Sequence, residues 1–269
     1  MYEAKDKVVL VTGGAAGIGA SVVEVFLREG AKHVAAVDID VSHGKQLEQD
    51  LVSKHGNKIK FYHCDITTGQ LDAVFYGIIS EFRNIDVLIN CAGIMNDSPD
   101  IYVKQIGVNL TALVRSSIKA FHHMRKDHGG KGGSILNIGS IVSLMHVPLL
   151  PIYAATKTAV LQFSTSLGME PHYSRSGVRV MTICFGATET TLLSRTKLRG
   201  LDAETDAILE ATIDIYPKQT IESASSALME AFKKGSSAST WLSTSGKPAQ
   251  DITANVSKGF EIMSQDLNS

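Results

Sequence analysis

Short runs of β-branched and aliphatic residues alternate along this chain with longer stretches of helical period, and this alternation restricts the fold more than any other feature. The runs are continuously apolar, as expected for strands that are buried on both faces of a parallel sheet. They lie at Val8–Val11, His33–Ile39, Ile59–Cys64, Asp86–Asn90, Ser134–Ile138 and Val178–Cys184. A weaker run at Thr240–Ser243 predicts a seventh strand at the sheet edge.

The stretches between the runs carry apolar residues at spacings of three and four, which is typical of helices that cover such a sheet. They span Ile18–Glu29, Gly44–Lys54, Gln70–Phe82, Asp100–Arg125, Tyr153–His172 and Ile221–Lys233. The pattern predicts an α/β fold of the doubly wound, Rossmann type, with helices on both faces. The length of 269 residues permits one such domain or two small ones. Since no repeat or low-complexity linker divides the chain, we expect a single domain over residues 1–269.

Between residues 186 and 217 the pattern is looser, because leucines alternate there with charged residues. One interpretation is a substrate loop of short mobile helices that closes over an apolar ligand. The other is an amphipathic surface helix packed on the core. The sequence leaves both open.

Composition excludes several functional classes. With a formal net charge of -1 and 20% charged residues, the chain has no electrostatic footprint for nucleic acid or anionic lipid. Its three cysteines, Cys64, Cys91 and Cys184, are far apart and predict neither a disulfide framework nor a metal site. The first apolar run is too short for a signal peptide or a membrane span. We therefore expect a cytoplasmic protein that binds no metal and no nucleic acid.

The residues after the first run have the spacing of a phosphate-binding turn: Thr12-Gly13-Gly14-Ala15-Ala16-Gly17-Ile18-Gly19. Glycine permits the tight turn and lets the backbone approach a pyrophosphate, while N–H groups of the following helix face the phosphates. Taken alone, such a glycine pattern has another explanation, because a tight turn between a strand and a helix can require glycine for steric reasons only. Its place between a strand and a helix favours a dinucleotide. Thr12 is expected to stabilise the turn rather than to bind the ligand.

Asp38 closes the second run, where its carboxylate can accept hydrogen bonds from a ribose diol and would repel a 2′-phosphate. No arginine lies between residues 37 and 40 to receive that phosphate, so NAD is expected in preference to NADP. Asp40 is interpreted as a loop or cap residue. Asp65 and Ile66 directly follow the third run, at the expected end of its strand, where they could meet the adenine.

Tyr153 and Lys157 are four residues apart near the start of a helical stretch, which places them on one face. A neighbouring ammonium, together with a positively charged nicotinamide ring, would lower the pKa of the phenol toward the range of a useful base. Ser140, after the fifth run, could hold the reacting oxygen. Taken separately, such a tyrosine–lysine pair is usually a surface pair, and such a serine is usually a turn or cap residue.

Taken together, these residues resemble the short-chain dehydrogenase/reductase family in its single-domain form, over at least Lys7 to Trp241. The matching positions are the turn from Thr12 to Gly19, Asp38, Asp65-Ile66, Asn90-Cys91-Ala92-Gly93, Asn109, Ser140, and Tyr153 with Lys157. Seven ordered matches are far more specific than any one. The resemblance implies seven parallel strands in the order 3-2-1-4-5-6-7, with the cofactor across their carboxyl ends.

The resemblance also implies a role for each position. Tyr153 would be the catalytic acid/base, and Ser140 would orient and polarise the substrate oxygen. Lys157 would perturb the pKa of Tyr153 and bind the ribose, and Asn109 would anchor a proton-relay water. The expected cofactor-binding residues are Gly13, Gly17, Ile18, Gly19, Asp38, Asp65, Ile66, Asn90, Ala92, Gly93, Tyr153, Lys157, Gly186, Thr188 and Thr190.

The candidates for the substrate pocket are mostly apolar, which suits a lipid-like, terpenoid or steroid alcohol. They are Ser140, Ile141, Met145, His146, Leu149, Leu150 and Leu192. His146 is either a polar contact for the substrate or an exposed loop residue. Two positions depart from the family pattern: Phe185 stands where proline is usual, which removes a rigid turn beside the nicotinamide, and Cys91 stands where asparagine is commonest.

Within the family, Asp38, the chain length, the segment 184–190 and Trp241 most resemble the branch of the insect alcohol dehydrogenases and 15-hydroxyprostaglandin dehydrogenase. This resemblance implies NAD-dependent oxidation of a secondary alcohol to a ketone by a homodimer or homotetramer. Two alternatives stay open: a cofactor-binding scaffold or storage protein without turnover, and a carbonyl reductase that runs the reverse reaction. The intact set Asn109, Ser140, Tyr153 and Lys157 favours an enzyme.

Overall fold

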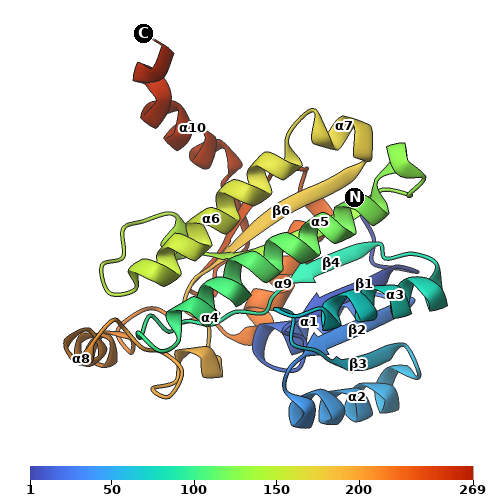
Figure 1. Ribbon diagram of the computed structural model, residues 1–269, viewed down its shortest axis with the longest axis horizontal. Helices are drawn as coiled ribbons and strands as arrows, with labels where there is room; N and C mark the ends of the chain where they lie inside the picture. The colour runs from blue at the N-terminus through green and yellow to red at the C-terminus, as the bar shows by residue number, and fades with distance from the viewer. Residues whose placement is uncertain (269) are drawn as a thin grey trace.

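The computed structural model describes residues 1–268, and Ser269, the last residue of the predicted 1–269 domain, lies outside the described residues. One sheet runs through the molecule with helices on both faces (Figure 1). Its strand order is β3-β2-β1-β4-β5-β6-β7-β8. The strands are β1 (Val8–Thr12), β2 (His33–Asp38), β3 (Ile59–His63), β4 (Val87–Asn90), β5 (Gly133–Ser140), β6 (Val178–Phe185), β7 (Thr240–Ser243) and β8 (Gln250–Asp251).

The first seven strands are parallel and follow the predicted order, so the expected fold class is confirmed. β8 is an addition, because it pairs antiparallel with β7 through Trp241 opposite Asp251 and Leu242 opposite Gln250. Both residues of β8 are exposed, and no apolar run marks them in the sequence.

The helices lie mostly where the periodicity predicts them. They are α1 (Gly17–Arg28), α2 (Val41–His55), α3 (Gln70–Phe82), α4 (Tyr102–Ile106), α5 (Leu113–Met124), α6 (Pro151–Gly168), α7 (His172–Ser176), α8 (Ala203–Thr212), α9 (Ile221–Lys234) and α10 (Thr253–Ser264). α2 begins earlier than predicted because the carboxylate of Asp40 accepts the backbone N–H of His43, 3.0 Å away, and so caps the helix. The interpretation of Asp40 as a cap residue is confirmed.

The prediction of one continuous helix over Asp100–Arg125 is wrong, because the helix is interrupted. A π-helical segment, Gly107–Ala112, separates α4 from α5. The apolar spacing continues through this segment, so periodicity alone cannot detect it. Such π-helical insertions are frequent at functional sites, and this one contains Asn109.

Alternation along β1 explains why both faces of the sheet are buried. Val9 and Val11 belong to one hydrophobic cluster, which includes residues of α1 and α9. Val8 and Leu10 belong to a second cluster, which includes residues of α3 and α5. Full burial of each such side chain contributes about 1.5–3 kcal/mol. The parallel strands therefore stand in a fixed register, and their carboxyl ends meet at one edge of the sheet.

Helix α10 extends away from the rest of the molecule (Figure 1), and none of its residues is buried. This explains why the sequence pattern did not predict it: no apolar stripe of the helix faces a core. Across residues 1–268, no helix combines the length and the apolar character that a membrane crossing requires.

His33, at the start of β2, makes stability dependent on pH. Its ring is 4% exposed and stacks on Phe82 with 4.2 Å between ring centroids. Burial lowers its pKa from 6.5 to about 4, against a smaller opposing effect of Glu81. Between those two pH values the unfolded chain binds a proton that the folded chain does not. The free energy of unfolding therefore falls as the pH drops from 6.5 toward 4, by about 3 kcal/mol in total.

The variant His33→Phe keeps the stacking on Phe82 but cannot titrate. We expect urea unfolding of this variant to lose much of the decrease in stability between neutral pH and about pH 4.5 that the parent shows. The exposed His146 provides a control, since His146→Gln should keep the parent's pH dependence. Equal acid sensitivity in His33→Phe and the parent would contradict the explanation.

Candidate active site

A cavity of about 650 Å³ lies at the edge where β1, β2, β4, β5 and β6 end. Most of the predicted site residues line it, from both the cofactor set and the substrate set. These are Gly13, Gly17, Ile18, Gly19, Asp38, Asp65, Ile66, Ala92, Gly93, Ser140, Ile141, Met145, Leu149, Leu150, Tyr153, Lys157, Gly186, Thr188, Thr190 and Leu192. Asn90, Asn109 and His146 are not among the residues that line the cavity.

The glycine turn between β1 and α1 has no room for side chains. Gly13 has φ +68°, and a Cβ built on it would lie 2.7 Å from the Cα of Ala92. A Cβ on Gly19 would overlap the carbonyl oxygen of Gly13. The turn thus presents bare backbone to the cavity, the property that close approach of a pyrophosphate requires.

Side chains around this turn hold it in place and leave the start of α1 uncovered. The carboxylate of Asp38 accepts the N–H groups of Ala15 at 3.1 Å and of Asp40 at 3.0 Å. The hydroxyl of Thr12 accepts the N–H of Cys91 at 3.2 Å, as expected for a turn-stabilising residue. No side chain caps α1, and its first turn contains no acidic residue. The positive end of the helix dipole therefore faces the cavity with no acidic side chain of α1 itself beside it, while the carboxylate of Asp38 accepts the N–H of Ala15 just before the helix.

Ser140, Tyr153 and Lys157 meet on the opposite wall of the cavity. Ser140 is the last residue of β5, and the other two lie in the first half of α6. The three side chains are buried, with exposed fractions of 7%, 6% and 4%. The Nζ atom of Lys157 lies 5.8 Å from the ring centroid of Tyr153 and donates to the carbonyl oxygen of Ile138 at 2.9 Å.

The expected decrease in the pKa of Tyr153 involves both Lys157 and a positively charged nicotinamide ring, and the chain's own groups act in the opposite direction. Burial raises the pKa of Tyr153 to about 12, and a hydrogen bond with Ser140 only partly opposes the increase. Burial also lowers the pKa of Lys157 to about 8. Removing water disfavours the phenolate more than the nearby ammonium favours it. The chain's own groups therefore keep Tyr153 as a neutral phenol at neutral pH.

Asn109 lies behind this wall, in the π-helical segment. Its side-chain oxygen accepts the N–H of Ile94, and its amide donates to the carbonyl of Ile94, both at 2.8 Å. A Cβ built on Gly93 would lie 3.6 Å from Oδ1 of Asn109 and 3.9 Å from Nζ of Lys157. The two hydrogen bonds of Asn109 thus hold the segment after β4 close to Lys157. The side chain of Asn109 itself does not line the cavity.

Asn90 was expected to bind the cofactor, but the structure directs its side chain into the protein. The Asn90 amide donates to Ser117 at 2.9 Å and to Asn137 at 2.8 Å, and its oxygen accepts from Ser116 at 2.6 Å. These bonds satisfy the side chain within the layer between β4, β5 and α5. His146 is exposed, which agrees with the simpler of its two interpretations.

The loop after β6 follows a defined path without the usual proline. Phe185 packs into the core with 5% of its surface exposed and also lines the cavity. The hydroxyl of Thr188 donates to the carbonyl of Gly186 at 3.0 Å, and the amide of Gln219 donates to Thr188 at 3.1 Å. Thr190 lies against Gly17 of the glycine turn. The loop therefore reaches from the end of β6 to the start of α1.

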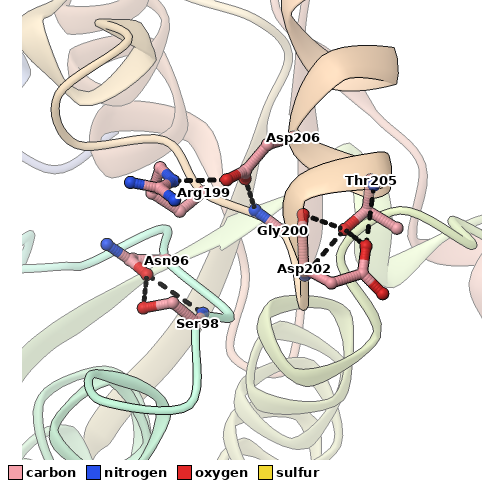
Figure 2. Close-up of polar contacts among 7 residues, drawn as sticks. All are labelled: Asn96, Ser98, Arg199, Gly200, Asp202, Thr205 and Asp206. Carbon is pink, nitrogen blue, oxygen red and sulfur yellow. Dashed lines mark hydrogen bonds and ion pairs between the residues drawn. The ribbon is translucent and has the colours of Figure 1, made fainter.

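Segment 186–217 forms one wall of the cavity rather than a separate surface layer. Leu198 and Leu209 are buried in a third hydrophobic cluster together with Tyr153, Met95 and Leu150. The start of α8 is fixed by a capping box between Asp202 and Thr205, and Asp206 accepts from Arg199 at 2.6 Å and from the N–H of Gly200 (Figure 2). The backbones of Asn96 and Arg199 pair in an isolated parallel β-bridge, which joins this segment to the loop after β4.

Several residues that line the cavity are absent from the predicted set. They are mainly apolar and come from the loop after β4, the segment between β5 and α6, and segment 186–217: Ile94, Met95, Val142, Val147, Leu193, Leu198, Leu209, Ile213 and Tyr216. The alternation of leucines with charges after residue 190 was the available signal, but it does not show which leucines face a ligand. Within residues 1–268, no cluster of three or more His, Cys, Asp or Glu side chains is arranged to hold a metal.

Comparison with known proteins connects this site to described enzymes. A family model described as short chain dehydrogenase matches residues 7–199. The 15-hydroxyprostaglandin dehydrogenase [NAD(+)] of Homo sapiens is 35% identical over 189 residues, which are 70% of each chain. Alcohol dehydrogenase 1 of Ceratitis capitata is 37% identical over 136 residues, which are 50% of this chain and 52% of that protein.

Solved structures with the same architecture cover more of the chain. A 3-ketoacyl-(acyl-carrier-protein) reductase from Brucella melitensis, complexed with NADH, superposes with a TM-score of 0.74 at 23% identity and covers 90% of this chain and 98% of its own. At that identity the likeness concerns the fold alone. A short-chain dehydrogenase from Sphingobium yanoikuyae in complex with NADPH superposes with a TM-score of 0.72 at 26% identity, and the shares are 88% and 87%.

Proposed function

The chain belongs to the short-chain dehydrogenase family of oxidoreductases, and from this premise we propose that it oxidises an apolar secondary alcohol to a ketone with NAD. The observation that carries the proposal is the meeting of Ser140, Tyr153 and Lys157 in one cavity with a bare glycine turn. One cavity is thus lined both by residues suited to bind a dinucleotide and by residues suited to transfer a proton. We further propose that one domain performs both tasks.

The residues present fit a nicotinamide dinucleotide. Gly13, Gly17 and Gly19 would let the pyrophosphate approach the backbone, and the uncapped start of α1 would favour its charge. The carboxylate of Asp38 lines the cavity and would accept hydrogen bonds from the adenosine ribose. The same charge would repel a 2′-phosphate. This favours NAD, the cofactor in the name of the human relative.

The cofactor, when bound, supplies the acceptor for the hydride that leaves the carbinol carbon. With its phenol deprotonated, a form that Lys157 and the positively charged nicotinamide ring of the bound cofactor would favour, Tyr153 would take the proton of the substrate hydroxyl, so that carbon and oxygen are left joined as a ketone. Ser140 holds the reacting oxygen by a hydrogen bond. Lys157 lies close enough to favour the phenolate form of Tyr153, and its Nζ is held in place by the carbonyl of Ile138.

The apolar wall supports an apolar substrate. Met95, Leu150 and Leu198 are buried around the ring of Tyr153, and Leu149 and Leu192 pack against them. A strongly polar substrate would leave its groups unpaired against these side chains, which is unfavourable. We therefore propose a lipid-like, terpenoid or steroid alcohol. The carbonyl reductase alternative uses the same residues in reverse, and a raised pKa of Tyr153 suits its role as proton donor there.

Turnover of a panel of secondary alcohols tests the function. Purified protein incubated with each alcohol and with NAD or NADP should form reduced nicotinamide, with higher kcat/KM for apolar alcohols and for NAD. A protein that binds NAD but converts none of the alcohols, nor the matching ketones with NADH, would instead be the scaffold that the fold also permits.

Asp38 allows a sharper test of cofactor choice. The double variant Asp38→Ser, Ile39→Arg removes the repelling carboxylate and adds a cation beside the cavity, where Ile39 is 56% exposed. We expect the ratio of kcat/KM for NADP to that for NAD to rise by about 100-fold or more. Each single variant should give a smaller change. An unchanged ratio in the double variant would contradict the role of Asp38.

A further inference from the structure

The start of α6 is capped by a residue far away in the sequence. Pro151 is the first residue of this helix and has no N–H, and Leu150 before it provides no side-chain cap. The next two N–H groups, of Ile152 and Tyr153, donate to the carboxylate of Asp97 at 2.7 and 2.9 Å. Ala154 then donates to Leu150 and begins the regular helical bonds. Asp97 therefore satisfies every free backbone donor in the first turn.

Asp97 is itself held on all sides. It is fully buried, and its Oδ1 atom also accepts the side-chain amide of the buried Gln105 in α4 at 2.7 Å. The backbone N–H of Asp97 donates to the carbonyl of Arg199, within segment 186–217, at 2.8 Å. On either side of Asp97, the N–H and the hydroxyl of Ser98 both donate hydrogen bonds to the side-chain oxygen of Asn96 (Figure 2). A buried carboxylate with this many hydrogen-bond donors is held firmly in position, because any displacement would leave its charge without partners.

We propose that Asp97 is a positioning residue of the reaction, which fixes the backbone of Tyr153 relative to Ser140 and to the apolar wall. This inference rests on the proposed function. Asp97 does not line the cavity, so it would contact neither substrate nor cofactor directly. It acts on Tyr153 through the first turn of α6, and a small displacement of a reacting group is costly even when its cause lies outside the site.

Charge provides a second connection between the two residues. The groups that face the Tyr153 phenol are Ser140 at the end of β5, Cys184 in β6, Lys157 in α6 and Asp97. After burial, which has the largest effect, a hydrogen bond with Ser140 lowers the pKa of Tyr153 and the negative charge of Asp97 raises it. Removing the charge of Asp97 should therefore lower the pKa of Tyr153.

The test is Asp97→Asn, which keeps the shape of the side chain but loses the charge and one acceptor. We expect kcat to fall by about 10- to 100-fold with an unchanged KM for the cofactor. We also expect the pH profile of kcat for oxidation to move to lower pH by about half a unit. Asp86→Asn is the matched control, since Asp86 also accepts a backbone N–H, from Val8 at 2.8 Å, but just before β4, at the opposite edge of the sheet.

Ultraviolet difference titration of tyrosinate separates this inference from the proposed function, because it needs no turnover. With Tyr153→Phe as the reference, the titration midpoint of Tyr153 should be lower in Asp97→Asn than in the parent and unchanged in Asp86→Asn. An unchanged midpoint overturns the positioning role even in an active enzyme. A parent that converts no alcohol contradicts the proposed function instead, whatever the midpoint.

A second variant keeps the inference testable if Asp97→Asn does not fold. Gln105→Met conserves side-chain volume and the Asp97 charge but removes one of the three donors to the carboxylate. We expect kcat to fall several-fold with an unchanged KM for the cofactor, and the pH profile to stay in place because the charge remains. A kcat equal to that of the parent overturns the inference.

Discussion

Replacing Tyr153 with phenylalanine is expected to lower kcat for alcohol oxidation by about 1,000-fold while the affinity for NAD stays nearly unchanged. The variant keeps the ring within its hydrophobic cluster and removes only the phenolic oxygen to which we assign the substrate proton. General acid–base groups typically contribute a rate factor of about 10²–10⁴. Steady-state kinetics for turnover and calorimetry for cofactor binding would measure the two effects separately.

A tyrosine elsewhere provides the control for this variant. Tyr76 on α3 is 69% exposed and does not line the cavity, so Tyr76→Phe should leave kcat as in the parent. A Tyr153→Phe variant that turns over alcohol as fast as the parent would rule out the proposed acid/base role. A variant that also loses NAD binding would point to a structural defect instead.

Gly19→Ala is expected to abolish NAD binding and to destabilise the protein by at least about 2 kcal/mol. The added methyl group would overlap the carbonyl oxygen of Gly13, which is backbone and cannot rotate away as a side chain could. The turn must open, and it then no longer presents its backbone to a pyrophosphate. Calorimetric titration with NAD and urea unfolding would measure the two losses.

The same substitution elsewhere in the chain should have the opposite sign. Gly77 lies within α3 and is exposed, and apart from its own helix backbone no atom of residues 1–268 lies within 4 Å of the place that a Cβ would occupy. Gly77→Ala should therefore stabilise the protein by about 0.5–1 kcal/mol, because alanine loses less backbone entropy in a helix. NAD affinity should not change. If Gly19→Ala bound NAD as well as Gly77→Ala does, the glycine turn would not be the phosphate site.

The sheet could be predicted from the sequence because its central strands are buried on both faces. Continuous runs such as Val8–Val11 have no other common explanation in a chain that also contains helical periods. β8 and α10 could not be predicted in this way, since both are exposed and carry no burial pattern. The π-helical segment at Gly107–Ala112 was missed because the apolar spacing continues through it.

The residues of the candidate site also differ in how far the sequence could predict them. Residues with a fixed place in a strand or helix, such as Ser140 and Lys157, could be located from spacing, and they line one cavity. Asn90 could also be located, but the sequence does not tell which way its side chain points. Asp97 could not be singled out, because it caps a helix that begins more than fifty residues later. Contacts over such distances depend on tertiary structure and leave no local pattern.

Leu209 and Ile213 show that the cavity has two walls of different origin. One is made by strand ends and lies within the residues matched by the family model, 7–199, whereas α8 lies beyond them. Under the proposed function, changes in α8 would therefore reshape part of the space for the alcohol while the glycine turn, Ser140 and Lys157 stay in place. In that case, part of the substrate space is encoded outside the stretch that carries Ser140, Tyr153 and Lys157, and evolution or engineering in α8 would alter substrate range without changing those residues.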